Sequence, residues 1–121
     1  MNNMWYAGKF DEASWNLVLR MGFTPSYLRE ARRGLASVEQ VTTFTRELLA
    51  GDVIEVHSEV VEVRDKVIRI LHRMFKTETQ ELAASCAIIG VHMDLTARKS
   101  CDIPAAIRGL AEGYIRRLEA A

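Results

Sequence analysis

The 121-residue sequence predicts an α+β domain in which one long central helix is wrapped by an antiparallel sheet, with a further helix at the C-terminus. Two observations predict this class. Apolar residues recur every three or four positions over the first 21 residues, and after Gly34 they recur every second position along four runs. No linker, repeat or low-complexity tract separates these segments, so residues 1–121 are expected to form a single domain.

The first helix is predicted over residues 4–21. Its apolar stripe consists of Tyr6, Phe10, Ala13 and Leu17, at steps of four, three and four residues. Charged and amide side chains occupy the opposite side, which is typical of an amphipathic helix packed on a core. We expect it to be the central helix of the domain.

Capping residues bound the two N-terminal helices. Asn2 or Asn3 can accept a hydrogen bond from a free N–H at the start of the first helix, and Gly22 can end it in the left-handed conformation. Thr24-Pro25 is typical of an N-cap followed by a first-turn proline. We expect Gly34 to end the short second helix.

Four strand-like runs follow, at residues 36–48, 53–64, 66–76 and 82–94. They are rich in Val, Ile, Thr and Phe, and Ala50-Gly51-Asp52 is a turn signal between the first two. Consecutive runs of this kind predict an antiparallel meander.

The third run is apolar on both faces, with Ile68, Ile70 and Met74 on one side and Val67, Leu71 and Phe75 on the other. One long helix cannot cover both faces of a sheet, so this pattern favours an oligomer interface. Pro104 then opens the last helix. Its predicted apolar stripe consists of Ile107, Leu110, Ala111, Tyr114, Ile115 and Leu118.

Composition narrows the function classes. Sixteen Lys and Arg balance sixteen Asp and Glu, so the chain lacks the positive field that a nucleic-acid partner requires. Cys86 and Cys101 have no Cys or His neighbours at metal-ligand spacing, which argues against a metal site and favours reduced thiols in the cytoplasm. No signal-peptide pattern and no apolar run of about 20 residues is present, so no membrane contact is expected.

The first helix resembles the start of a known family. Asn2-Asn3-Met4-Trp5-Tyr6 followed by Phe10-Asp11-Glu12-Ala13 resembles the G-H-x-N-N-x-x-Y-x-x-x-F-x-x-A signature of hotdog-fold acyl-CoA thioesterases of the 4-hydroxybenzoyl-CoA thioesterase type. Later landmarks in the same order are Gly22, Arg46-Glu47-Leu48 before Gly51-Asp52, and Arg98-Lys99 before Ile103-Pro104. The resemblance therefore extends from residue 2 to residue 104.

This resemblance implies a hotdog fold and an enzyme that hydrolyses acyl-CoA without a metal or organic cofactor. It also implies a homodimer, or a homotetramer as a dimer of dimers, with active sites at subunit interfaces. The thioester carbonyl would point at the N–H groups that open the central helix, whose partial positive charge suits a developing oxyanion.

The family's carboxylate is an Asp that precedes the Gly-His of the signature, whereas this sequence begins after that His and also lacks the usual first strand. Two interpretations are open. Met1 is an internal methionine of a longer protein, or the chain is a non-catalytic hotdog protein that binds acyl-CoA or assembles with a partner. Reading the DNA upstream of the start codon would distinguish them.

The residues at the helix start are the first site candidates. Asn2 and Asn3 are predicted to hold the thioester carbonyl, although simple helix capping explains them equally well. Met4, Trp5 and Tyr6 are predicted substrate contacts, with a subunit contact or a core position as the alternative.

Other candidates lie elsewhere in the chain. Glu39 is proposed to replace the missing carboxylate, against the alternative of a solvated strand residue, while Asp11 is interpreted as solvated or salt-bridged. Arg98 and Lys99 are predicted to hold the CoA phosphates, against an ordinary solvated loop. The three histidines are interpreted as packing or surface groups.

Overall fold

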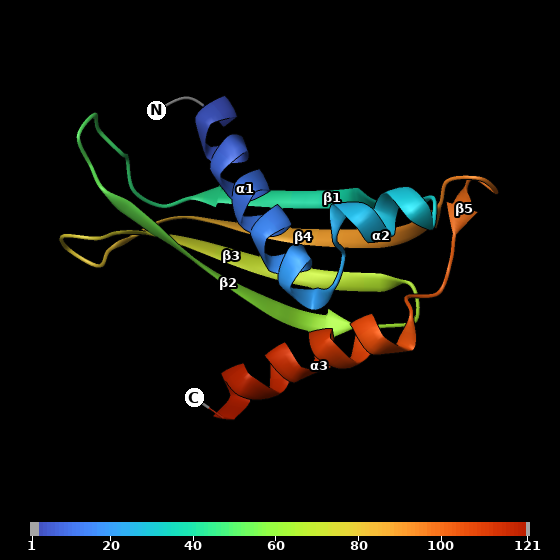
Figure 1. Ribbon diagram of the computed structural model, residues 1–121. Coiled ribbons are helices and arrows are strands. Elements are labelled where there is room, and N and C mark those ends of the chain that lie inside the picture. The colour runs from blue at the N-terminus through green and yellow to red at the C-terminus, as the bar shows by residue number, and fades with distance from the viewer. Residues whose placement is uncertain (1–2, 121) are drawn as a thin grey trace.

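The computed structural model describes the backbone of residues 3–120 and the side chains of residues 4–115. Helix α1 (Asn3–Met21) lies across one face of an antiparallel sheet, and helix α3 (Ala105–Ala120) packs along the edge strand β2 (Ile54–Val63), as Figure 1 shows. The predicted class, a central helix against an antiparallel sheet with a C-terminal helix, is confirmed.

Helix α1 ends at the predicted glycine. Gly22 has φ +111°, and its N–H donates to Leu19 O at 3.1 Å, while the next N–H, of Phe23, donates to Val18 O at 3.0 Å. These two bonds satisfy carbonyls that the last turn of a helix leaves free. The chain therefore turns sharply away from α1 at this point.

The second helix, α2 (Pro25–Glu30), begins as predicted, because the Thr24 side chain accepts a hydrogen bond from the N–H of Tyr27 at 3.1 Å. Its end differs from the prediction. Arg32 takes the left-handed conformation with φ +54°, whereas Gly34 already belongs to strand β1 (Arg33–Phe44). A backbone turn made by a non-glycine residue leaves little trace in a sequence.

The strand order corrects the predicted meander. It is β1-β4-β3-β2, in which β3 spans Val67–Lys76 and β4 spans Leu82–Asp94, and a short strand β5 (Lys99–Ser100) pairs with β4. Strands β2, β3 and β4 follow one another as predicted, but β1 pairs with β4 rather than with β2. The connection between β1 and β2 therefore crosses from one edge of the sheet to the other.

The turn within residues 50–52 belongs to this crossing connection and not to a hairpin. Gly51 has φ +95°, and the Asp52 carboxylate accepts a hydrogen bond from the N–H of Leu49 at 2.8 Å. The neighbouring Leu48 is 1% exposed, so it anchors the connection in the core. The predicted turn is confirmed, whereas the predicted pairing of the two strands that flank it is wrong.

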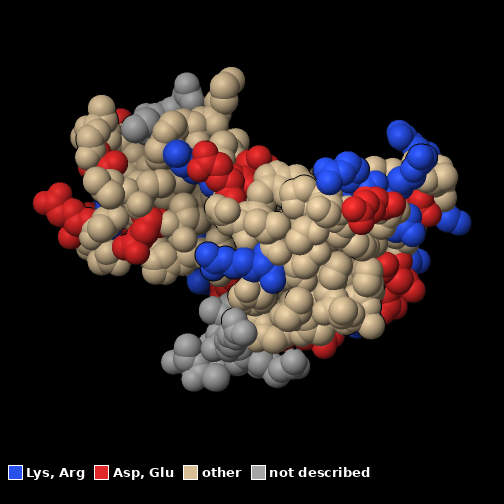
Figure 2. Space-filling model, in the orientation of Figure 1, with Lys and Arg blue, Asp and Glu red and all other residues tan. Residues whose placement is uncertain are grey.

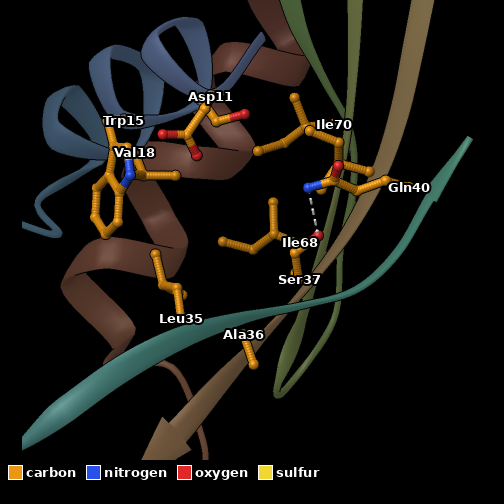
Figure 3. Close-up of a pocket in the computed structure, with 12 residues that line it drawn as sticks. Asp11, Trp15, Val18, Leu35, Ala36, Ser37, Gln40, Ile68 and Ile70 are labelled. Atoms are coloured by element: carbon orange, nitrogen blue, oxygen red, sulfur yellow. Dashed lines mark hydrogen bonds between the residues drawn. The ribbon is translucent and has the colours of Figure 1, made fainter. Parts of the chain in front are cut away.

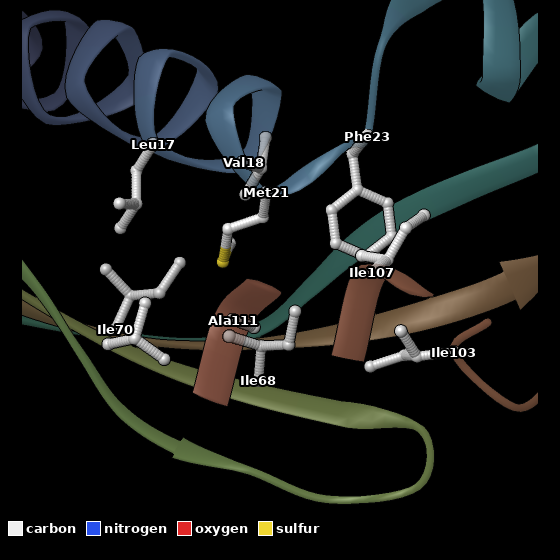
Figure 4. Close-up of a cluster of buried hydrophobic side chains, with 10 residues drawn as sticks. Leu17, Val18, Met21, Phe23, Ile68, Ile70, Ile103, Ile107 and Ala111 are labelled. Atoms are coloured by element: carbon white, nitrogen blue, oxygen red, sulfur yellow. The ribbon is translucent and has the colours of Figure 1, made fainter. Parts of the chain in front are cut away.

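Two clusters of buried side chains join α1 to the inner face of the sheet. The cluster under the C-terminal half of α1 also contacts α3 (Figure 4), and it contains Leu17, Val18, Met21, Phe23, Val60, Ile68, Ile70, Ile103, Ile107 and Ala111. The cluster under the N-terminal half contains Tyr6, Phe10, Leu48, Met74, Ala83, Ala84, Cys86 and Ile88.

The stripe predicted for α3 is correct only in part. Ile107 and Ala111 are buried, and Tyr114 and Ile115 pack against the same cluster, but Leu110 is 53% exposed. Leu118 lies outside the side chains that the structure describes. Within the described residues, none of the helices is long and apolar enough to cross a membrane.

Candidate functional site

A pocket lies between α1 and strand β1. Four residues of α1 form one wall, and because Asp11, Ser14, Trp15 and Val18 follow at steps of three, one and three, they share one side of the helix. This side is adjacent to the core stripe: Val18 is buried against the sheet, whereas Trp15 is 49% exposed. Figure 3 shows α1 on one side of the pocket and β1 on the other.

The opposite wall and the floor come from the sheet. Leu35, Ser37 and Gln40 of β1 face α1, Ala36 lies between them with its side chain turned to the other face of the sheet (Figure 3), and the floor consists of Ile68, Ile70, Ile88 and Gly90. The pocket encloses about 100 Å³. A Cβ added at Gly90 would meet nothing closer than the carbonyl oxygen of Ile68 at 3.8 Å, so the glycine widens the floor rather than relieving a clash.

The polar groups of the pocket are few and come from both walls. The Gln40 side-chain amide donates to Ser37 Oγ at 3.0 Å, which directs both side chains along β1 (Figure 3). Asp11 is the carboxylate in the lining; it is exposed, as the solvated interpretation predicts, and it has no ion-pair partner among the residues that the structure describes. An apolar hollow with one carboxylate and a few hydrogen-bonding groups has the general character of a small-molecule site.

A buried histidine adjoins this pocket. His72 of β3 is completely buried, its Nε2 lies 2.8 Å from Ser14 Oγ, and its Nδ1 lies 2.7 Å from Ser58 Oγ of β2. Phe10 stacks on the ring with 6.0 Å between centroids. Because burial removes the water that would solvate an imidazolium, the pKa of His72 is lowered from 6.5 to about 4, and the ring is neutral at pH 7.

Ser58 opens onto a second hollow, on the other side of α1. This hollow encloses about 500 Å³ and is more polar than the first. Its lining comes from α1, β2 and α3 and consists of Lys9, Glu12, Ala13, Asn16, Leu17, Arg20, Val56, Ser58 and Tyr114. The Ser14, His72 and Ser58 side chains therefore connect two separate hollows beneath α1.

A second buried histidine, His92, holds neighbouring segments of the fold together. His92 of β4 is 1% exposed, its Nε2 lies 3.0 Å from the Tyr27 hydroxyl, and its Nδ1 lies 3.2 Å from the carbonyl of Cys101. It thereby ties α2 and the segment after β5 to the sheet. Burial raises the pKa of Tyr27, although nearby Arg33 opposes this. No pocket described above includes His92.

Of the residues predicted at the start of α1, Met4, Trp5 and Tyr6 do not line the pocket. Asn2 lies outside the described residues, and Asn3 opens α1 without a described side chain. Met4 is 82% exposed, Trp5 packs edge-on against Tyr6 at 5.2 Å, and Tyr6 is buried in the core. Asp11 follows Asn3 by eight residues, or about 12 Å at 1.5 Å per residue.

Glu39 and Gln40 face opposite sides of the sheet. Gln40 lines the pocket beside α1, whereas Glu39 lines a shallow hollow on the other face together with Val41 and Leu71. A β-bulge at Val38, between Ser37 and Glu39, shifts the pairing register of β1 with β4. Within one copy of the chain, the sheet therefore separates Glu39 from the carboxylate in the pocket.

Arg98 and Lys99 lie at the end of the sheet opposite the start of α1 (Figure 1). Arg98 has φ +60° in the turn before β5, and both side chains are exposed. Arg29 and Arg32 are exposed at the same end, where Figure 2 shows blue side chains gathered beside α2 and β5. The predicted cations thus lie near further exposed arginines, and Figure 2 shows acidic side chains among them.

Sequence reasoning missed Asp11, Ser14 and Gln40 as pocket residues. The sequence contained a signal for this side of the helix. Trp15 and Val18 follow Asp11 at four and seven residues, so they form a second apolar stripe on the same side as Asp11. Within the described residues, no group of three His, Cys, Asp or Glu side chains is arranged to hold a metal ion.

A family model described as the thioesterase-like superfamily matches residues 1–110. Among solved structures, a hypothetical protein from Staphylococcus aureus in complex with CoA superposes with a TM-score of 0.92 at 19% identity, over 96% of this chain and 73% of that chain. A comparison with curated proteins finds no match.

Two further structures carry names that state a reaction. A gentisyl-coenzyme A thioesterase has a TM-score of 0.78 at 24% identity, with 93% of this chain and 86% of that chain covered. A 1,4-dihydroxy-2-naphthoyl-CoA thioesterase from Synechocystis has a TM-score of 0.81 at 14% identity, with 92% and 82% covered. These likenesses confirm the predicted hotdog fold.

Proposed function

Because the chain belongs to the thioesterase-like superfamily, we propose that it hydrolyses the CoA thioester of a small acyl group. The observation that carries this proposal is the pocket between α1 and β1, which combines an apolar floor with the carboxylate of Asp11. Its volume of about 100 Å³ suits a short acyl group, because a cavity of about 150 Å³ holds benzene. CoA and CoA thioesters are named for the structural neighbours reported above.

In this proposal Asp11 acts as the general base. Its carboxylate takes a proton from a water molecule, and the water oxygen attacks the thioester carbon to form a tetrahedral oxyanion. The carbon–sulfur bond then breaks, and Asp11 returns the proton to the CoA sulfur. The products are the carboxylic acid and free CoA.

The helix start is the proposed second half of the site. Asn2 and Asn3 are the proposed carbonyl-binding residues. Asn3 opens α1, where free N–H groups and the helix dipole favour a developing oxyanion, and Met4, Trp5 and Tyr6 are the proposed substrate contacts beside it. The start of α1 at Asn3 lies about 12 Å from Asp11 along the helix. Its N–H groups therefore reach the carbonyl beside Asp11 only if they come from a second copy. The proposal is therefore a homodimer with shared sites.

The edge strand β1 supports this assembly. Among the residues that the structure describes, it pairs only with β4, and the exposed apolar side chains along it are Val38, Val41 and Phe44, at 60%, 52% and 49%. Natural sheets rarely leave a long apolar edge uncovered, because its free N–H and C=O groups pair readily with another strand. We propose that two copies pair through β1, next to the pocket.

The exposed cations at the other end of β1 are the proposed site for the CoA phosphates. Arg98 and Lys99, together with Arg32, are exposed there, and Arg33 is held by Asp94 at 3.2 Å. Charged donors of this kind bind phosphate oxygens through charge-assisted hydrogen bonds. The pantetheine arm would then extend along α2 and β1 towards the pocket.

The test compares two carboxylates. Free CoA is measured after incubation with short aliphatic and aromatic acyl-CoAs, for the native protein and for Asp11→Asn and Glu39→Gln. If Asp11 is the base, Asp11→Asn loses on the order of 10²-fold or more in kcat, while Glu39→Gln keeps native turnover. The reverse pattern would assign the role to Glu39, as the strand pattern predicts.

A native protein that releases no CoA from any of these substrates would contradict the thioesterase proposal. Titration calorimetry with the same acyl-CoAs then tests the alternative, a hotdog protein that binds acyl-CoA without hydrolysing it. Binding without turnover would favour the non-catalytic hotdog protein, and neither binding nor turnover would exclude both.

A further inference from the structure

The protons in the hydrogen-bond chain beneath α1 can be assigned from its geometry. Ser14 has one hydroxyl proton, and Ser14 Oγ donates it to the carbonyl of Phe10 at 3.0 Å. The 2.8 Å contact between Ser14 Oγ and His72 Nε2 then requires a proton on Nε2. A neutral ring carries only one such proton, so Nδ1 accepts from the Ser58 hydroxyl at 2.7 Å.

This tautomer leaves the Ser14 proton available to a ligand. The Phe10 carbonyl is also positioned to accept the N–H of Ser14 within the helix, so the hydroxyl bond to it is an additional one that can be exchanged. In the other tautomer Nε2 would be an acceptor, and the Ser14 proton would be held by the buried ring. By donating to Nδ1, the Ser58 hydroxyl favours the tautomer in which Ser14 can donate to a ligand.

Ser14 is placed where such a donation would matter. It lines the pocket, one helical turn from Asp11 on the same side of α1. Its Oγ is held by His72 from beneath, so the hydroxyl can turn from the Phe10 carbonyl towards the pocket without moving the side chain.

We propose that Ser14 donates its hydroxyl proton as a hydrogen bond to the thioester carbonyl oxygen, and that His72 and Ser58 are positioning residues that keep this proton available. The inference rests on the proposed thioesterase function. As the water attacks, the carbonyl π electrons move onto the oxygen, and the Ser14 hydrogen bond stabilises the resulting oxyanion. The Ser14 proton is not transferred, and Asp11 remains the base.

The first measurement does not require turnover. In the native protein, ¹⁵N NMR of the His72 ring should show the proton on Nε2, and Ser58→Ala should give a mixture of both tautomers. The matched variant Ser58→Thr keeps a hydroxyl and should restore the native spectrum. A native ring protonated at Nδ1 would overturn the proposal whether or not the protein hydrolyses any thioester.

The second measurement separates donation from packing. Ser14→Ala should lower kcat on the order of a hundredfold with little change in KM, and Ser14→Thr should recover most of the loss. Ser58 lines the other hollow, and Ser58→Ala should lower kcat several-fold. Native kcat in Ser14→Ala would overturn the inference while leaving the thioesterase proposal intact.

Binding covers the case of an inactive native protein. The probe is a ketone analogue of acetyl-CoA, in which a methylene group replaces the sulfur. Its carbonyl should bind native protein and Ser14→Thr more tightly than Ser14→Ala by on the order of tenfold, the value of one hydrogen bond to a neutral group. Equal affinity for all three would overturn the inference.

Discussion

Burial of His72 should make the stability of this protein depend on pH between about 6.5 and 4. The native pKa of the ring is lowered from 6.5 to about 4 because it is desolvated beneath α1. In this window the unfolded chain binds a proton that the native state cannot bind, so the free energy of unfolding falls as the pH is lowered. At ~1.4 kcal/mol per pH unit the loss is on the order of 3 kcal/mol.

The loss is confined to this window. Above pH 6.5 the ring is neutral in both states, and below pH 4 it is charged in both, so the contribution is fully present at neutral pH and absent at the acidic limit. Typical domains unfold at a cost of about 5–15 kcal/mol. A single buried ring would thus account for a large part of the acid sensitivity.

The assay is urea unfolding at pH 7 and pH 4.5, for the native protein and for His72→Gln. Glutamine cannot ionise in this range and still offers a donor and an acceptor to Ser14 and Ser58. Other titrating groups are common to both proteins, so the difference between their pH losses isolates the ring. Equal pH losses, or an NMR titration of His72 near pH 6.5, would refute the reasoning.

Two further predictions concern a backbone turn and the assembly. Gly22→Ala should lower the free energy of unfolding by about 1 kcal/mol or more, because φ is +111° and the new Cβ would lie 3.1 Å from Ile107 Cγ1. Gly8→Ala should raise the free energy of unfolding by up to ~1 kcal/mol, because its new Cβ would meet nothing within 4 Å. A loss in both variants would contradict the backbone argument. Val41→Lys should shift a native dimer to monomer in sedimentation. The control Leu110→Lys, at an exposed position of α3, should leave the dimer intact. A monomeric native protein would contradict the assembly.

Much of the fold could be predicted from local patterns. The last long strand was predicted at residues 82–94 and is observed as Leu82–Asp94, with buried positions recurring every second residue from Ala84 to Ile88 and again at His92. The first strand was predicted at residues 36–48 but is Arg33–Phe44. An extended connection after Phe44 has the same residue pattern as a strand, so periodicity alone does not separate them.

The candidate site was harder to predict. The role of Asn3 stays a prediction from a contiguous motif, whereas Asp11 was interpreted as a solvated helix residue, and it is exposed but also lines the pocket. Its place in a pocket depends on β1 lying beside β4 and curling towards α1. His72 is 58 residues from Ser14 and 14 from Ser58, so no motif joins the three side chains.

The sequence by itself determined the α+β class, the central helix and its Gly22 terminus, and the signature of the thioesterase-like family. These follow from spacing and from local backbone preferences, which act over a few residues. Only the tertiary structure decided that β1 joins β4, that Gln40 rather than Glu39 faces α1, and that His72 is buried between two serines. A period-two pattern determines which face of a strand is buried, but it does not determine the neighbouring strand, and the pocket depends on that neighbour.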